Sequence, residues 1–186
     1  MNYSDFLPGV ADIGLRNILW RLYCPVENEA MSLCNHVKSW IPIQRVFEAQ
    51  PQDGDGDWIW HGKPAQWAEI RLRPKNDDMG IIFHEVFHST FHESPLWYDS
   101  QNESWGDGFC DAFRYYMEEM QLGGQSAWSK NFKTYFGDYN RQKQDKYRGW
   151  GSLIVLHNNL DYEKFKRFWI ERNKESNTPL STILGI

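Results

Sequence analysis

Residues 80–92 read Gly-Ile-Ile-Phe-His-Glu-Val-Phe-His-Ser-Thr-Phe-His and hold three of the six histidines of the chain. His84, His88 and His92 recur at every fourth position, and apolar residues fill half of the positions between them. An α-helix has 3.6 residues per turn, so residues four apart project from one face. We therefore expect a helix over about 79–93, with an apolar side in the core and a polar edge of histidines.

The first two of these histidines have the spacing of a zinc site. In His84-Glu85-Val86-Phe87-His88, two imidazoles one turn apart can bind one Zn²⁺ at about 2.0–2.1 Å, and Glu85 lies where a base for a water molecule is needed. His and Glu are costly in apolar surroundings without a partner, so a metal explains them better than histidines bonded to core carbonyls. His92 lies about 12 Å along the helix from His84, too far for the same ion.

The third zinc ligand must come from outside this helix, because a catalytic zinc normally takes three protein ligands and a water. The metzincin pattern HExxHxxGxxH is ruled out, since positions 91 and 94 are Phe and Ser. A carboxylate on a second helix remains. Asp107 follows His88 after eighteen intervening residues, and Asp111 lies one turn further on the same face. Glu103 is the rival carboxylate.

With the HExxH segment, Gly106-Asp-Gly-Phe-Cys-Asp-Ala-Phe113 resembles the gluzincin metallopeptidases, the group that contains thermolysin and aminopeptidase N. The resemblance implies that Asp107 is the third Zn²⁺ ligand and that Asp111 orients a ligand imidazole. The family has Glu where this chain has Asp107, so the second helix must lie closer or another group must bind. Aspzincins show that an Asp ligand is chemically acceptable. Cys110 can also bind zinc, but we expect a small buried core thiol.

A peptide-hydrolysing site also needs a donor for the developing oxyanion. The segment Asp145-Lys-Tyr-Arg-Gly-Trp-Gly-Ser-Leu-Ile-Val-Leu156 resembles the YxKGxxxL segment of aminopeptidase-N-type enzymes, in which the Tyr is that donor. The resemblance points to Tyr147, which lies one residue out of register. Tyr115, Tyr116 and His157 are the competing candidates.

The gluzincin resemblance also implies an edge strand just before the metal helix, where extended substrate pairs its backbone. The alternating stretch Gln66-Trp-Ala-Glu-Ile-Arg-Leu-Arg-Pro74 occupies that position. An unpaired strand edge is a natural receptor for a peptide. An ordinary interior strand is the alternative, and alternation alone does not decide between them.

Strands early and helices late predict an α+β fold in one domain spanning residues 1–186. We expect a small N-terminal helical and β-sheet part, followed by a mainly helical zincin-like metallopeptidase core. The run Gln52-Asp-Gly-Asp-Gly-Asp-Trp58 predicts a hairpin tip, since it lacks the Gly and Glu positions of a calcium loop. The expected helices are 11–23 and 27–39, separated by Pro25, and then 107–121, 126–136, 148–159 and 161–174; the expected strands are 42–49, 58–61 and 66–74.

The overall composition limits the classes of binding partner and the cellular compartments that we expect. The net charge is −5 and no long basic run occurs, which argues against nucleic acid or an anionic membrane as the main partner. No segment approaches transmembrane length. The three cysteines stand at no metal-ligand spacing and indicate buried thiols in a reducing compartment. We expect a cytoplasmic protein, or a secreted one if a leader was removed.

These observations predict a zinc metallopeptidase that hydrolyses a peptide or protein substrate, with Glu85 as general base and Tyr147 as oxyanion donor. Two alternatives stay open. One is a non-catalytic binding domain stabilised by zinc, and the other is a zinc hydrolase of a non-protein amide.

Overall fold

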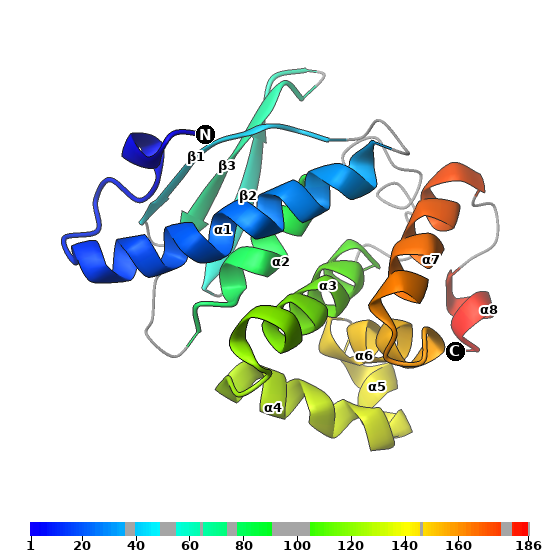
Figure 1. Cartoon of the computed structure of the whole chain (residues 1–186). Helices are drawn as coiled ribbons and strands as arrows, with labels where there is room; N and C mark the ends of the chain where they lie inside the picture. Colours follow the sequence, from blue (N-terminus) through cyan, green and yellow to red (C-terminus); the bar gives the residue numbers. More distant parts are fainter. Residues whose placement is uncertain are drawn as a thin grey trace.

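The computed structural model describes residues 1–35, 40–48, 55–63, 65–73, 78–90, 105–145, 147–175 and 180–185. A three-stranded sheet and the long helix α1 (Ile13–Cys34) lie at one end, and helices α3–α8 gather at the other (Figure 1). The short helix α2 (Ile81–His88) lies between these two parts and packs against α1, α3 and the sheet. This is the predicted α+β fold, with the strands early in the chain and most helices late.

The sheet consists of β1 (Ile43–Glu48), β2 (Gly56–His61) and β3 (Trp67–Leu72), in the order β1-β3-β2. β3 pairs in parallel with β1 and antiparallel with β2. The expectation that 66–74 forms the edge strand is therefore wrong, because β3 is the central strand and β2 is the edge strand that packs on α2. Residues 52–54 of the predicted hairpin tip lie outside the described residues. The segment does not join neighbouring strands, because β3 lies between β1 and β2, and the antiparallel neighbours along the chain are β2 and β3.

Helix α1 is continuous, although Pro25 was expected to separate two helices. Proline removes one backbone hydrogen bond and crowds the carbonyl four residues before it, which is Arg21 here. Both residues lie on the exposed side of α1, where water reaches that carbonyl. On the opposite side a buried stripe runs through the proline position: Leu19, Tyr23, Val26, Ala30 and Leu33. Burial of this stripe outweighs the hydrogen bond lost at Pro25. The prediction of two separate helices is therefore wrong.

The C-terminal helices follow the predicted pattern, and the described part of the chain also has three short elements that were not expected. The expected ones are α3 (Trp105–Leu122), α4 (Ala127–Lys133) continued by the 3-10 helix η3 (Thr134–Gly137), α6 (Arg148–His157) and α7 (Tyr162–Glu175). The others are a 3-10 turn η1 (Tyr3–Asp5), α5 (Tyr139–Gln144) and α8 (Leu180–Leu184). These three are too short to give a helical period in sequence.

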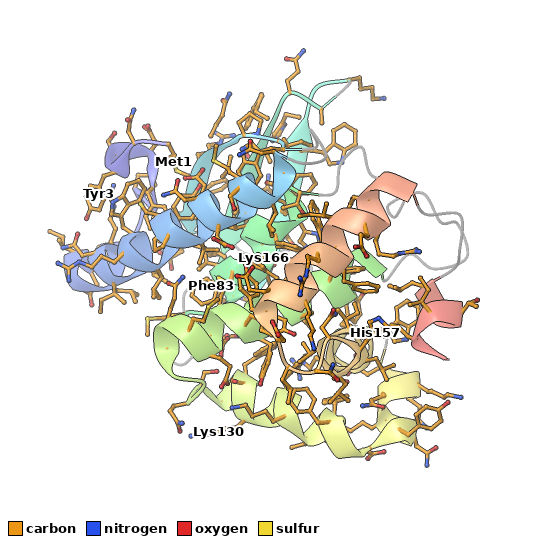
Figure 2. The ribbon with its side chains drawn as sticks, turned by 45° about the vertical axis from the view of Figure 1, so that its right-hand side comes forward. Met1, Tyr3, Phe83, Lys130, His157 and Lys166 are labelled. Carbon is orange, nitrogen blue, oxygen red and sulfur yellow. The ribbon has the colours of Figure 1, made fainter. Side chains whose placement is uncertain are left out.

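Aromatic side chains fix α2 against α3 in the core. The rings of Phe87 on α2 and Phe113 on α3 stack with their centroids 4.2 Å apart. Phe83, also on α2, is fully buried and lies between α1 and α3 (Figure 2). Burying one such side chain contributes about 1.5–3 kcal/mol, so this interface sets the position of α2. Within the described part of the chain, no helix is both long and apolar enough to cross a membrane.

Candidate metal centre

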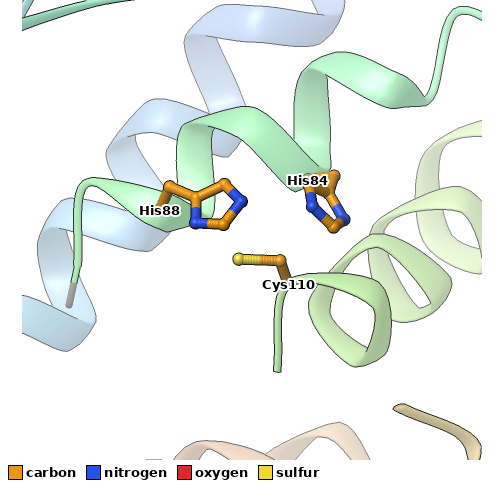
Figure 3. A group of neighbouring side chains, drawn as sticks. All are labelled: His84, His88 and Cys110. Carbon is orange, nitrogen blue, oxygen red and sulfur yellow. The ribbon is translucent and has the colours of Figure 1, made fainter. Parts of the chain in front are cut away.

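The two histidines of α2 project together because the apolar positions of the helix face the core. Phe83, Val86 and Phe87 are fully buried, which turns His84 and His88 toward α3. The imidazole centroids lie 4.9 Å apart, and each side chain is only 12% exposed. Figure 3 shows both rings reaching from α2 toward the neighbouring helix. The one-turn spacing read from the sequence thus gives a pair of adjacent imidazoles.

Asp107, on the first turn of α3, faces this pair. Its Oδ1 lies 3.6 Å from His84 Nε2 and 3.5 Å from His88 Nε2. Donor atoms around a tetrahedral Zn²⁺ at about 2.0–2.1 Å are roughly 3.3 Å apart. Two nitrogens and one carboxylate oxygen also form a donor set that zinc accepts. The three residues therefore fit a zinc ion, and α3 lies close enough to α2 for the shorter Asp side chain to reach.

Asp111 lies one turn further along α3, on the other side of the His84 ring. Its Oδ1 is 2.8 Å from His84 Nδ1, so the two ring nitrogens of His84 face two different carboxylates. A carboxylate on one imidazole nitrogen fixes the ring orientation and the tautomer, which leaves the other nitrogen available to a metal. This is the arrangement that the gluzincin resemblance implied for Asp111.

The carboxylates of Asp107 and Asp111 favour a positive charge at His84. Burial lowers the pKa of His84, but contacts with Asp107 and Asp111 outweigh burial and raise that pKa to about 10. Burial raises the pKa of Asp107, yet the contacts with His84 and His88 prevail and hold it well below its usual range. A protonated His84 thus supplies the charge that a bound cation would supply in its place.

Glu85 lies beside the histidine pair, against the edge strand β2. It is 4% exposed, and burial raises the pKa of its carboxyl. A Cβ at Gly56 of β2 would lie 2.6 Å from Glu85 Oε1, so only glycine leaves room for this carboxyl. Two positions further along β2, Trp58 donates from Nε1 to Ser89 Oγ at 2.7 Å, and its ring stacks on His88 at a centroid distance of 6.1 Å. The edge strand therefore covers one side of the histidine pair.

The start of α6 forms the opposite wall of a cleft of about 590 Å³ that opens over these groups. The Asp145 carboxylate accepts the backbone N–H groups of Tyr147 and Arg148, each at 3.0 Å, and so fixes the first turn of α6. A Cβ at Gly151 would lie 3.0 Å from the Gly108 carbonyl oxygen, so glycine there allows the close packing of α6 on α3. The cleft is lined by residues of all three walls: Asp55, Gly56, Asp57, Trp58, Asp78, Ile81, His84, Glu85, His88, Asp107, Asp111, Arg114, Trp128, Asp145, Tyr147 and Arg148.

Among the candidates for the oxyanion donor, Tyr147 is the one that lines this cleft. Its side chain is 54% exposed at the start of α6. Tyr115 is buried and stacks on Phe132, and Tyr116 is buried near Tyr162. His157 lies at the far end of α6 (labelled in Figure 2) and packs on Phe168. Glu103 and His92 lie outside the described residues.

Cys110 is a buried core thiol, as the sequence predicted, and it also lies beside the histidine pair. It is fully buried, and its Sγ lies within 4.8 Å of the donor atoms of both His84 and His88. Figure 3 shows the side chain of Cys110 reaching from α3 below the two imidazoles, with its sulfur on the side of His88. Asp107 Oδ1 lies 3.6 and 3.5 Å from the two imidazole nitrogens, so Asp107 and Cys110 both face the histidine pair from α3. The signal was present in the sequence, because Cys110 follows Asp107 by three residues and shares its helix face.

Arg114 lies on the same face of α3 as Asp107 and Asp111, and the sequence analysis did not single it out. It is 2% exposed, donates from Nε to Glu118 at 2.8 Å and contacts Asp78. Its guanidinium also lies 4.0 Å from the centroid of the Trp128 ring. These contacts occupy Arg114, so it forms a fixed part of the cleft wall beside the histidines.

No protein-family profile, no curated protein and no solved structure matches this chain. The function is therefore argued from the geometry of the site.

Proposed function

We propose that the protein is a zinc-dependent peptidase in which His84, His88 and Asp107 hold the metal, as the gluzincin resemblance implies. The observation that carries the proposal is the convergence of the three donor atoms, with Asp107 Oδ1 at 3.6 and 3.5 Å from the two imidazole nitrogens. The contact between Asp111 and His84 Nδ1 adds the outer carboxylate that zinc-binding histidines usually have.

Zinc, when bound, supplies the Lewis-acid polarisation of a peptide carbonyl and of a water molecule. Glu85 is the general base in this proposal. It takes a proton from the water and passes it to the leaving amine. The raised pKa of its buried carboxyl suits both steps, because a carboxyl that is harder to ionise holds the proton long enough to deliver it. Tyr147, on the opposite wall, donates a hydrogen bond to the oxyanion.

The edge strand β2 takes the role that the sequence suggested for residues 66–74. It borders the cleft with Gly56, Asp57 and Trp58, together with Asp55 just before the strand, and Gly56 lies against Glu85. Edge strands accept extended peptides through backbone hydrogen bonds, with side chains entering pockets at alternate positions. A peptide or protein substrate lying along β2 passes directly over Glu85 and the histidine pair, which favours a peptide bond as the target.

The test is Glu85→Gln, which keeps the size of the side chain and removes the base. Zinc content, measured by atomic emission, stays at about one per chain, because Glu85 is not a donor. Hydrolysis of a broad peptide library, followed by mass spectrometry, falls by roughly 10²–10⁴-fold. Wild-type protein that holds zinc and cleaves nothing, or a Glu85→Gln variant that cleaves at the wild-type rate, contradicts the proposal.

A second candidate is a zinc-stabilised domain without catalysis, and Cys110 is the observation that favours it. With Asp107 and the two histidines, a bound thiolate completes four protein donors, and four-donor zinc sites are usually structural. Zinc bound at unit stoichiometry without any cleavage supports this candidate over the peptidase.

A further inference from the structure

Cys110 belongs to the buried core and also lies beside the two histidines of α2. It lies on α3 between Asp107 and Asp111, which both contact the imidazole of His84. Its thiol is fully buried, and Sγ and the donor atoms of the two histidines lie within 4.8 Å of one another. Cys24 and Cys34 lie on α1, and neither belongs to such a donor group among the residues that the structure describes.

We propose that Cys110 is a fourth, displaceable donor to the metal that His84, His88 and Asp107 hold, an inference that rests on the proposed zinc site. When the thiol binds, its S–H bond breaks, a sulfur–metal bond forms and the proton leaves to the solvent. Thiolate and imidazole together suit Zn²⁺, Co²⁺ and Cd²⁺.

The distances are compatible with Cys110 and Asp107 reaching the same ion. A nitrogen and a sulfur on one tetrahedral zinc are roughly 3.6 Å apart, given bond lengths of about 2.0–2.1 and 2.3 Å. Asp107 Oδ1 already lies at 3.5–3.6 Å from the imidazole nitrogens. The thiol sulfur lies within 4.8 Å of a ring nitrogen of each histidine, so at most a small movement brings it to the same ion. The site thus has a protein donor for the position that a peptidase keeps open, and substrate turnover requires that donor to leave.

The direct test is the absorption spectrum of the protein loaded with Co²⁺. A sulfur–cobalt bond gives an intense charge-transfer band in the near ultraviolet, which nitrogen and oxygen donors do not give. We expect the band in the wild type and in Cys24→Ser, the matched control on α1. We expect it to disappear in Cys110→Ser, while Co²⁺ still binds through the remaining donors. Absence of the band in the wild type, or its persistence in Cys110→Ser, overturns the proposal.

A second measurement covers the case in which Cys110→Ser does not fold. The ¹¹³Cd resonance of wild-type protein loaded with ¹¹³Cd²⁺ reports directly on sulfur ligation and requires no variant. A shift in the range of a site with one sulfur donor supports the proposal, and a shift in the range of nitrogen and oxygen donors alone contradicts it.

The outcomes separate this inference from the proposed peptidase. A cobalt band together with zinc-loaded protein that cleaves no peptide upholds the thiol donor and rejects the peptidase. Peptide cleavage without the band does the reverse. Protein that binds no divalent metal overturns both.

Discussion

Two buried carboxylate clusters in this molecule obtain their counter-charge in different ways. On the face of the sheet that points away from α2, Glu69 is 1% exposed and receives Arg45 Nε and Arg71 Nη2, each at 2.8 Å. Two guanidinium groups thus neutralise one carboxylate. At the α2–α3 interface, Asp107, Asp111 and Glu85 face the imidazoles of His84 and His88. Arginines of the chain itself supply the counter-charge of the first cluster. The second cluster has more negative than positive charge unless a proton or a metal cation is added.

The pKa values express the same difference. Burial raises the pKa of Glu69, but Arg45 and Arg71 prevail and lower it. At the α2–α3 interface, burial raises the pKa of Glu85, and the charges of Asp107 and Asp57 raise it further against the opposing histidines. The sheet cluster is a structural ion pair, and the interface cluster is suited to binding a cation.

Removing one imidazole tests this contrast most strongly. In His88→Ala we expect zinc affinity to fall by more than about 100-fold, because even an outer residue of a zinc site contributes roughly 10–100-fold. Competition with a chromogenic chelator measures the affinity. Zinc stabilises the folded state it binds, so the wild-type melting temperature rises with zinc and that of His88→Ala does not. An equal rise in both proteins means that the ion binds elsewhere.

The outer carboxylate gives a smaller effect. Asp111→Asn keeps the shape and loses the charge opposite His84 Nδ1, so we expect zinc affinity to fall by about 10–100-fold. The same chelator competition measures it. Glu69→Gln is the matched control, since it removes a buried carboxylate from the other cluster. Equal losses of affinity in the two variants contradict the special role of Asp111.

The contact between β2 and Glu85 is the next feature to break. A Cβ at Gly56 would approach Glu85 Oε1 to 2.6 Å, so Gly56→Ala has to displace that carboxyl. Overpacking of this kind costs about 1–3 kcal/mol in the free energy of unfolding, measured by urea denaturation. We expect peptide hydrolysis to fall while zinc stoichiometry is retained. Loss of zinc instead of activity places the Glu85 contact in metal binding rather than in proton transfer.

The smallest expected effect is the pH dependence of the stability that Glu69 contributes through Arg45 and Arg71. Because the folded-state pKa of Glu69 is lowered, its ion pairs stabilise the fold above the unfolded-state pKa of about 4.3 and lose this contribution as pH falls through the folded-state value. Arg45 and Arg71 are partly exposed, so solvent screening limits the contribution to about 1 kcal/mol. Urea denaturation of wild type and Glu69→Gln from pH 7 to pH 3 measures it. We expect the difference between the two proteins to shrink toward acidic pH, and a constant difference contradicts this cause.

The sequence predicted those parts of the site that depend on helix periodicity. The positions of His84 and His88 on α2, and of Asp107 and Asp111 on α3, follow from spacings of four residues. Their meeting across two helices came from the family resemblance, and no local rule predicts it. Cys110 shares the face of Asp107 and Asp111, but periodicity cannot tell whether a buried thiol meets carbon or imidazole nitrogen.

Local sequence patterns did not predict the order of the strands or the continuity of α1. Alternation in residues 66–74 correctly indicated a strand, but the order β1-β3-β2 depends on pairings between separate segments. The continuity of α1 through Pro25 likewise depends on the core that its buried stripe contacts. In both places tertiary packing decided what the sequence left open.

The shortness of α2 has a consequence for how the metal and the fold depend on each other. The helix has eight residues and a length of about 12 Å, well below the roughly 12–15 residues that an isolated helix needs to persist in water. His84 lies at the middle of the helix and His88 at its end, so unwinding of the last turn separates the two donors. A bound ion therefore clamps the turn that carries it, and amide hydrogen exchange in α2 should slow more on zinc addition than exchange in α1, where no donor lies.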